Sequence, residues 1–253
     1  MPLEWKTTKL LTLNGRVTVT HWKKHSPRAL LAALESEPLK KFPRSTPPVW
    51  FHKFAGQTVV VRATAPHGLS HPILGGTEIE CMPPKQIFEI LKELAEKKAA
   101  FVEVPVALIE GKTFHAVVTL AKPHRASLQE VLSADDVSEF KKQALAVKAI
   151  KLFARLNALG YKHNHPDPVN VVVMKNDGVR LIDPTLLERF PKEGPWRIES
   201  IDSRARLLQP FMNIWLRNHP GQDYPIEHLH GLIRELDSAY HTEFKRVKAK
   251  QRV

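Results

Sequence analysis

The sequence predicts an α+β fold with a β-rich first half and a mainly helical second half. Short runs of apolar and β-branched residues, separated by turn residues, fill the chain to about residue 120. After Pro123 the apolar residues follow helical spacing instead. The composition, with 43% hydrophobic and 25% charged residues among 253, is that of an ordinary globular protein. We therefore expect a β-rich N-terminal lobe over 1–122 and a helical C-terminal lobe over 123–253.

Two hairpins are expected in the first lobe. Asn14-Gly15 separates two alternating runs, and this dipeptide favours the tight turn of a β-hairpin. Strands at 49–54 and 58–63 form the second hairpin, and its return strand is apolar enough to be buried inside a sheet.

Serine and proline mark the other elements of this lobe. Ser26 followed by Pro27 is typical of a helix start, with serine as the cap. The proline- and glycine-rich segment 64–76 is expected to be a loop. The remaining elements expected here are a helix over 84–98 and strands over 102–109 and 114–120.

The segment after residue 159 carries the residues with chemical potential. A long helix is expected over 136–159, and Gly160 ends it. A polar loop then closes at Asn170, and an apolar strand, a turn and a second apolar strand lead to Asp183. Such a hairpin holds Asn170 and Asp183 at neighbouring ends. Their oxygen-bearing side chains suit Mg²⁺, which takes carboxylates together with phosphate oxygens.

This segment resembles the catalytic loop and metal loop of the protein-kinase-like superfamily. There a His-x-Asp pattern is followed by four residues, Asn, two short strands and Asp. Here Asn170 lies five residues after His165, and Asp183 lies thirteen after Asn170. The resemblance covers about residues 49–190. Within the superfamily, this region is similar in particular to bacterial lipopolysaccharide-core and Kdo kinases. It implies a two-lobed kinase-like fold and transfer of phosphate from ATP, with Mg²⁺, to a hydroxyl of a lipopolysaccharide-type sugar.

The same resemblance implies roles for individual residues. The run Val59-Val60-Val61-Arg62 resembles the strand that carries a nucleotide-contacting lysine, and the segment 86–91 resembles the helix that carries a glutamate. The roles implied are nucleotide positioning for Arg62 and Glu89, metal binding for Asn170 and Asp183, and orientation of the acceptor hydroxyl for His165 or Asp167.

Four departures from the superfamily pattern make a second interpretation necessary. His165 stands where aspartate is usual, Pro184 follows Asp183 in place of glycine, Arg62 replaces lysine, and no glycine-rich phosphate loop is visible. A neutral imidazole accepts a proton at pH 7, and phosphoryl transfer depends mostly on positioning and charge neutralisation. The alternative is a catalytically inactive pseudokinase that acts as a binding or regulatory module.

Simpler interpretations of these residues also stand at this point. Asn170 and Asp183 are both favoured as turn residues at the end of a hairpin. A metal site could also be composed from His163, His165 and Asp167. Arg62 and Glu89 could face solvent on a strand and a helix.

The charge balance bears on partners. Lys and Arg number 38 against 26 Asp and Glu, a net charge of +12. We expect an anionic partner or substrate, either a glycolipid or an acidic membrane surface. The tail 244–253 carries five basic residues and no acid. Nucleic acid is the third class of partner, although no helix-turn-helix or aromatic-rich basic patch supports it.

Location follows from the apolar runs and the cysteine count. No stretch approaches the ~18 apolar residues of a membrane span, and the N-terminus has no signal-peptide core. Cys81 is the one cysteine, which excludes a disulfide scaffold. We expect a cytoplasmic protein. The alternative is a cytoplasmic protein that is attached peripherally to the inner face of the membrane.

Overall fold

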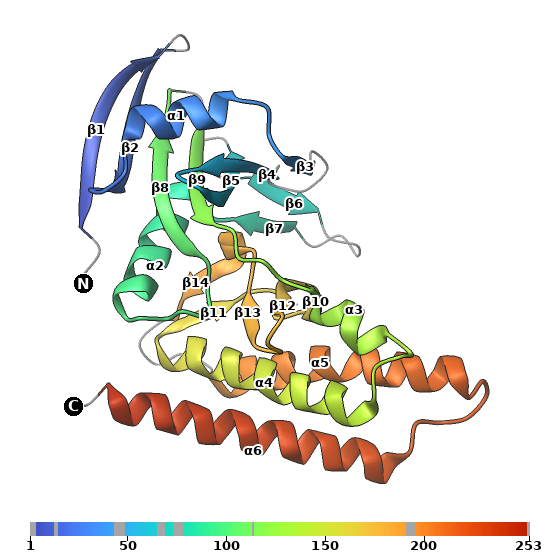
Figure 1. Ribbon diagram of the computed structural model, residues 1–253. Helices are drawn as coiled ribbons and strands as arrows, with labels where there is room; N and C mark the ends of the chain where they lie inside the picture. The colour runs from blue at the N-terminus through green and yellow to red at the C-terminus, as the bar shows by residue number, and fades with distance from the viewer. Residues whose placement is uncertain are drawn as a thin grey trace. The chain divides into compact units, whose positions relative to one another are not determined.

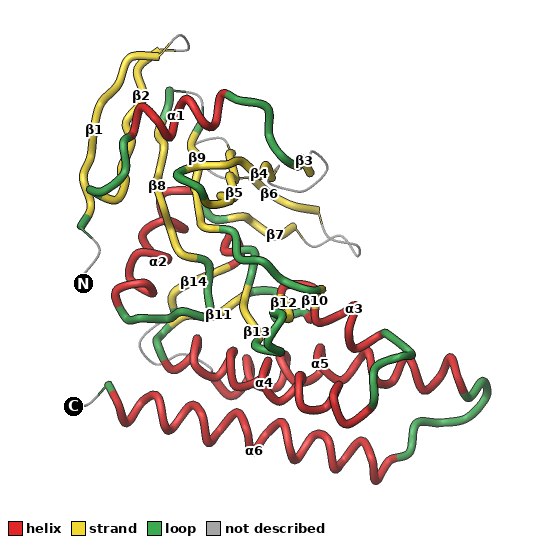
Figure 2. Tube along the Cα trace, in the orientation of Figure 1, coloured by secondary structure: helices red, strands yellow, loops and turns green. Residues whose placement is uncertain are grey.

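The chain forms two compact units. The computed structural model describes residues 4–12, 15–42, 49–64, 69–72, 78–112, 114–190 and 196–251. The first unit consists of Met1–Lys122 together with Pro184–Leu186, and the second consists of Pro123–Asp183 and Leu187–Val253. Strands dominate the first unit and helices the second (Figures 1 and 2). The predicted α+β class is therefore confirmed.

A seven-stranded antiparallel sheet is the framework of the first unit. Successive side chains of a strand point to opposite faces of the sheet, so Val17 and Val19 lie on the same face, and both are buried. In spatial order the strands are β1 (Trp5–Thr12), β2 (Gly15–Trp22), β8 (Val104–Glu110), β9 (His115–Leu120), β5 (Gln57–Thr64), β4 (Val49–Phe54) and β3 (Lys40–Phe42).

Both predicted hairpins are present in this sheet. β1 pairs with β2 from Trp5↔Trp22 to Thr12↔Gly15. Asn14, on which the turn prediction rested, lies outside the described residues. β4 pairs with β5, and the turn between them uses Ala55 and Gly56, at φ 48° and 75°.

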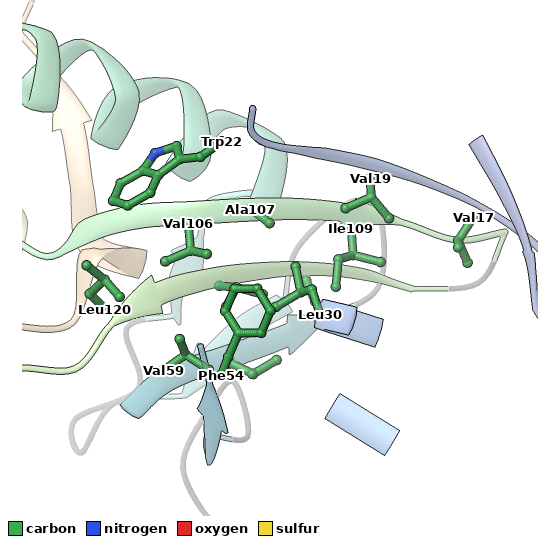
Figure 3. Close-up of a cluster of buried hydrophobic side chains, with 13 residues drawn as sticks. Val17, Val19, Trp22, Leu30, Phe54, Val59, Val106, Ala107, Ile109 and Leu120 are labelled. Carbon is green, nitrogen blue, oxygen red and sulfur yellow. The ribbon is translucent and has the colours of Figure 1, made fainter. Parts of the chain in front are cut away.

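Two helices accompany the sheet. Helix α1 (Pro27–Glu35) begins as the sequence predicts, because the Ser26 hydroxyl accepts a hydrogen bond from the backbone N–H of Ala29 at 3.3 Å. Leu30 of α1 is fully buried against strand residues such as Phe54 and Val59 (Figure 3). Helix α2 (Pro84–Glu96) buries one apolar stripe, made of Ile87, Phe88, Ile90, Leu91 and Leu94.

The segment between β5 and α2 differs from its prediction. We expected a loop over 64–76, but a short strand, β6 (Leu69–Pro72), lies within it and pairs antiparallel with β7 (Glu78–Cys81), which follows it. Pro72 is the last residue of β6, and proline is tolerated in an edge strand such as this one. Residues 65–68 and 73–77 lie outside the described part of the chain.

The described residues of the second unit form four α-helices and two small sheets. The helices are α3 (Leu128–Ser133), α4 (Glu139–Ala158), α5 (Trp196–Asn218) and α6 (Ile226–Lys250). One small sheet has the order β10 (Ala126–Ser127), β12 (Val171–Val173), β13 (Val179–Leu181), and the other pairs β11 (Tyr161–His163) with β14 (Leu187–Arg189). No described helix is both long and apolar enough to cross a membrane.

Helix α4 lies at the centre of this unit and packs against α5 and α6. It begins at Glu139, three residues later than predicted, because Ser138 caps it. It ends as predicted at Gly160, whose φ of 91° is strained for any residue with a Cβ.

A buried polar network joins α4 to α6. The Tyr240 hydroxyl donates to Oδ1 of Asn157 at 2.7 Å, and Nδ2 of Asn157 donates to the backbone oxygen of Tyr161 at 2.9 Å. Near it, the buried carboxylate of Glu243 binds Arg155 of α4 and Arg246 of its own helix. These two guanidinium groups hold the pKa of Glu243 at about 2, with the Arg246 hydrogen bond contributing most.

Candidate active site

A loop and a hairpin of the second unit bring together most of the polar residues singled out from the sequence. Strand β11 leads into the loop 163–170, which closes with a 3₁₀ turn at Pro168–Asn170. β12 and β13 then pair from Val171↔Leu181 to Val173↔Val179. The backbone N–H of Ile182 donates to the oxygen of Asn170 at 2.9 Å and extends the pairing. The predicted hairpin, with Asn170 and Asp183 at neighbouring ends, is confirmed.

Asp183 has an unusual backbone conformation. Its φ is 59°, in the left-handed region that costs most L-residues about 1–2 kcal/mol. Such strain persists where the surroundings over-determine it, and it is concentrated at functional sites. The next residue, Pro184, is buried.

His163 ties the loop to the end of the hairpin. Its Nδ1 accepts from the backbone N–H of His165 at 3.2 Å, and its Nε2 lies 3.1 Å from the backbone oxygen of Asp183. A carbonyl oxygen only accepts, so Nε2 carries the proton. Burial lowers the pKa of His163, although the nearby Asp183 charge opposes this. His163 is thus a neutral structural link with both ring nitrogens in use.

His165 and Asp167 form a hydrogen-bonded pair. Nδ1 of His165 lies 3.0 Å from Oδ2 of Asp167. The other carboxylate oxygen of Asp167, Oδ1, accepts from Nη1 of Arg206 at 2.7 Å. Both oxygens of Asp167 are therefore engaged, whereas no described residue hydrogen-bonds to Nε2 of His165.

Arg206 comes from α5 and has a second acidic partner. Its Nε lies 2.9 Å and 3.0 Å from the two carboxylate oxygens of Asp202, one helical turn earlier. Partial burial acts to lower the pKa of Arg206, but the hydrogen bonds and charges of Asp167 and Asp202 raise it overall. The i, i+4 spacing of Asp202 and Arg206 was the available sequence signal for this pair.

The oxygen atoms near the hairpin suit a hard cation better than a transition metal. Nδ2 of Asn170 donates to the backbone oxygen of His165 at 3.0 Å, and no described residue donates to its Oδ1. The Asn170 amide oxygen and the Asp183 carboxylate are ligand types that Mg²⁺ takes. No group of three or more His, Cys, Asp or Glu able to hold a metal occurs among the described residues. The alternative metal site at His163, His165 and Asp167 is therefore wrong.

Arg62, in the first unit, has a buried carboxylate partner. Nη1 and Nη2 lie 2.7 Å from the two carboxylate oxygens of Glu103, which also accepts from the Thr119 hydroxyl. Arg62 is 8% exposed, so the interpretation as a solvent-facing strand residue is wrong. Each charge has the hydrogen-bonded opposite partner that burial requires.

Glu89 lies in a different environment from the one expected of a nucleotide-positioning residue. Its carboxylate lies 3.7 Å from Nζ of Lys92, one turn along α2, and the side chain is 43% exposed. The acidic partner of Arg62 is Glu103, which the sequence interpretation missed. An acid between Val102 and Val104 in an apolar run was the signal that could have found it.

Comparisons with known proteins give similarity to solved structures alone. No family model matches the chain, and no curated protein matches it. Among solved structures, it is similar to one described as a divergent kinase that lacks the glycine-rich loop and regulates membrane ultrastructure of the Toxoplasma parasitophorous vacuole. The identity is 12% and the TM-score 0.46, over 75% of this chain and 62% of the other. The chain thus spans less than two thirds of that protein's length.

Proposed function

We propose that this protein is a phosphotransferase of the protein-kinase-like superfamily that uses ATP and Mg²⁺ and phosphorylates a hydroxyl group. The observation that carries the proposal is the β12–β13 register, with Asn170 and the strained Asp183 at neighbouring ends beside the loop of His165. Asn170 and Asp183 would hold Mg²⁺, which neutralises charge on the transferred phosphoryl group.

His165 is the residue proposed to accept the proton of the acceptor hydroxyl. Both carboxylate oxygens of Asp167 are taken by His165 and Arg206, so Asp167 is better placed to orient the ring than to act as the base. A positioned base typically contributes 10²–10⁴ in rate. His165→Ala should therefore lower turnover by ~10²-fold or more with little change in ATP binding.

Nucleotide binding is the first test. Thermal shift with ATP or ADP, with and without Mg²⁺, should show Mg²⁺-dependent stabilisation of about 2.7 kcal/mol at 100 times the Kd. Asp183→Asn should abolish the Mg²⁺-dependent part. Asp177→Asn is the matched control, because Asp177 lies at the opposite end of the hairpin with a similar φ of 56°. Equal Mg·ATP affinity in the two variants would reject the metal site.

Transfer itself is the second test. Purified protein given ATP and Mg²⁺ or Mn²⁺, with lipopolysaccharide-type sugars, lipids and proteins as acceptors, should transfer phosphate above the level of His165→Ala and Asp183→Asn. We propose a sugar hydroxyl of a lipopolysaccharide as the acceptor because of the sequence resemblance. Binding of nucleotide without transfer or hydrolysis would reject the enzyme.

The second candidate is a pseudokinase that acts as a binding or regulatory module. The specific observation in its favour is the Arg62–Glu103 pair, in which both terminal nitrogens of the guanidinium are already bound by one carboxylate. To position a nucleotide, Arg62 would have to use N–H donors other than the two that bind Glu103. Glu89 is proposed to assist in nucleotide positioning from α2. If Arg62→Met leaves the affinity for ATP unchanged, Arg62 takes part neither in nucleotide binding nor in the reaction.

We also propose an anionic partner, either an acidic membrane surface or a glycolipid, at the C-terminal end of α6. Lys245, Lys248 and Lys250 are exposed, and no acid follows Glu243 in the described helix. Each such charge gains about 1 kcal/mol near an anionic bilayer. Co-sedimentation with phosphatidylserine vesicles should fall when residues 245–253 are deleted and when salt is raised. With such a partner, we propose a location in the cytoplasm, at the inner face of the membrane.

A further inference from the structure

We propose that Arg206 and Asp202 of α5 are positioning residues that orient the Asp167 carboxylate and thereby select the tautomer of His165. This inference rests on the proposed function, because it concerns the base of that reaction. All four residues belong to the second unit, and three consecutive contacts link them.

The orientation begins at Asp202. Its two oxygens lie 2.9 Å and 3.0 Å from Nε of Arg206, within one face of α5. A guanidinium is planar and its donors are fixed in direction, so holding Nε also directs Nη1. That nitrogen lies 2.7 Å from Oδ1 of Asp167. Arg206 therefore imposes one rotational orientation on a carboxylate that would otherwise turn.

The same geometry determines the proton position on His165. Arginine has only donors, so the atom of residue 167 that faces Arg206 must be an acceptor. The second oxygen, Oδ2, then faces Nδ1 of His165 at 3.0 Å. A carboxylate accepts, so Nδ1 carries the hydrogen of the neutral imidazole. The lone pair is left on Nε2, which is the atom proposed to take the hydroxyl proton.

Asp167→Asn makes the role of Arg206 measurable. Arg206 would still demand an acceptor, so the amide oxygen of the new side chain would face it. The amide NH₂ would then donate to Nδ1 of His165, and the ring hydrogen would move to Nε2. The same logic explains why replacing the orienting aspartate of a serine-protease triad by asparagine gives the wrong tautomer.

Removing Arg206 should reverse this change. In the double variant Asp167→Asn with Arg206→Met, nothing forces the amide oxygen toward α5. The amide can turn and present its oxygen to Nδ1, which restores the original tautomer. A merely structural arginine would not show this dependence, because its loss would disturb the site in the same direction in both backgrounds.

The probe is the two-bond ¹H–¹⁵N correlation spectrum of the ¹⁵N-labelled full chain at about pH 8, where histidine is mostly neutral. The His165 signals are identified by their loss in His165→Gln. We expect Nδ1–H in the native protein, Nε2–H in Asp167→Asn, and Nδ1–H again in the double variant. An Asp167→Asn protein that keeps Nδ1–H, or a double variant that keeps Nε2–H, would overturn the proposal.

Arg204 provides the matched control. It lies two residues before Arg206 in α5 and forms an ion pair with Asp237 of α6, away from Asp167. In the Asp167→Asn background, Arg204→Gln should lower stability but leave His165 in the Nε2–H form. If it restores Nδ1–H as Arg206→Met does, packing of α5 rather than a specific contact is responsible, and the proposal is overturned.

A kinetic measurement separates this inference from the proposed function. If the native protein transfers phosphate, Asp167→Asn should lower kcat by ~10²-fold or more at unchanged KM for ATP, and adding Arg206→Met should recover at least ~10-fold. The absence of recovery, with the tautomer restored, would overturn the link to catalysis. If the native protein transfers nothing but the tautomers change as expected, the proposed function fails and the positioning role stands.

Discussion

Arg62 and Glu103 form a bidentate ion pair that reaches across a strand to which neither residue belongs. Arg62 lies on β5 and Glu103 immediately precedes β8, while β9 lies between these strands and contributes Thr119. Each terminal guanidinium nitrogen is 2.7 Å from a carboxylate oxygen. The pair thus links three strands of the sheet inside the first unit.

Breaking this pair from one side should be costly. Glu103→Gln leaves the Arg62 charge buried without its counter-charge, and such losses typically cost 3–5 kcal/mol. Arg62→Met with Glu103→Leu, which removes both charges, should cost much less. Urea unfolding of the single and double variants measures the difference. A double variant as unstable as Glu103→Gln would contradict this account.

The Glu243 carboxylate should make the second unit sensitive to acid. Its pKa is lowered from 4.5 to about 2 in the folded chain by Arg246 and Arg155. A depressed folded pKa gives stability that is fully present above pH 4.5 and is lost as the pH falls toward 2. The whole contribution is on the order of 3 kcal/mol.

The measurement is the free energy of unfolding between pH 6 and pH 2.5. Glu243→Gln should be less stable than the native chain at pH 6, and the gap should narrow as the pH falls. Glu227→Gln is the control, because Glu227 is an exposed residue in the first turn of the same helix. A gap that is independent of pH would show that Glu243 acts through packing alone.

Tyr240→Phe tests the buried network between α4 and α6. The substitution removes the hydroxyl that donates to Asn157 at 2.7 Å and leaves that amide oxygen buried without its donor. The expected loss is about 1–3 kcal/mol. Tyr224→Phe, at a half-buried position on the α5–α6 connection, should stay within about 0.5 kcal/mol. Equal effects of the two substitutions would contradict the assigned hydrogen bond.

The left-handed backbone of Asp183 should be relieved by glycine. At φ 59°, Asp183→Gly should be about 1 kcal/mol more stable than Asp183→Ala, because glycine has no Cβ to clash. Thermal unfolding of the two variants measures this, and both should lose Mg²⁺-dependent nucleotide binding. A glycine variant no more stable than the alanine variant would show that the backbone at this position is not strained.

Elements set by local sequence patterns were predicted, whereas partners set by topology were not. The hairpin at 49–63, the stripe of α2 and the β12–β13 hairpin that brings Asn170 and Asp183 to the same end follow from spacing and turn residues. The spatial order of strands does not follow from such patterns. It was therefore not possible to see that Glu103 would meet Arg62, or that Glu89 would lie near Lys92.

Long sequence separation hid the other partners. Arg206 lies 39 positions after Asp167, and the pairing depends on how α5 packs in the second unit. The i, i+4 spacing in the sequence indicates only the pairing of Arg206 with Asp202, one helical turn earlier. The strands β6 and β7 were missed for a different reason, since proline and glycine indicate turns but leave room for short strands between them.

The three residues after Asp183 bear on how this chain can be divided. Pro184–Leu186 belong to the first unit, where the Thr185 oxygen accepts from the backbone N–H of Met82, although the residues on both sides belong to the second. The first unit is therefore discontinuous in sequence. It therefore cannot be exchanged or expressed whole as one segment of polypeptide. A cut after residue 122 would leave the N-terminal product without Pro184–Leu186 and the C-terminal product with these three extra residues. The chain passes from one unit to the other at three places, one of them directly beside Asp183.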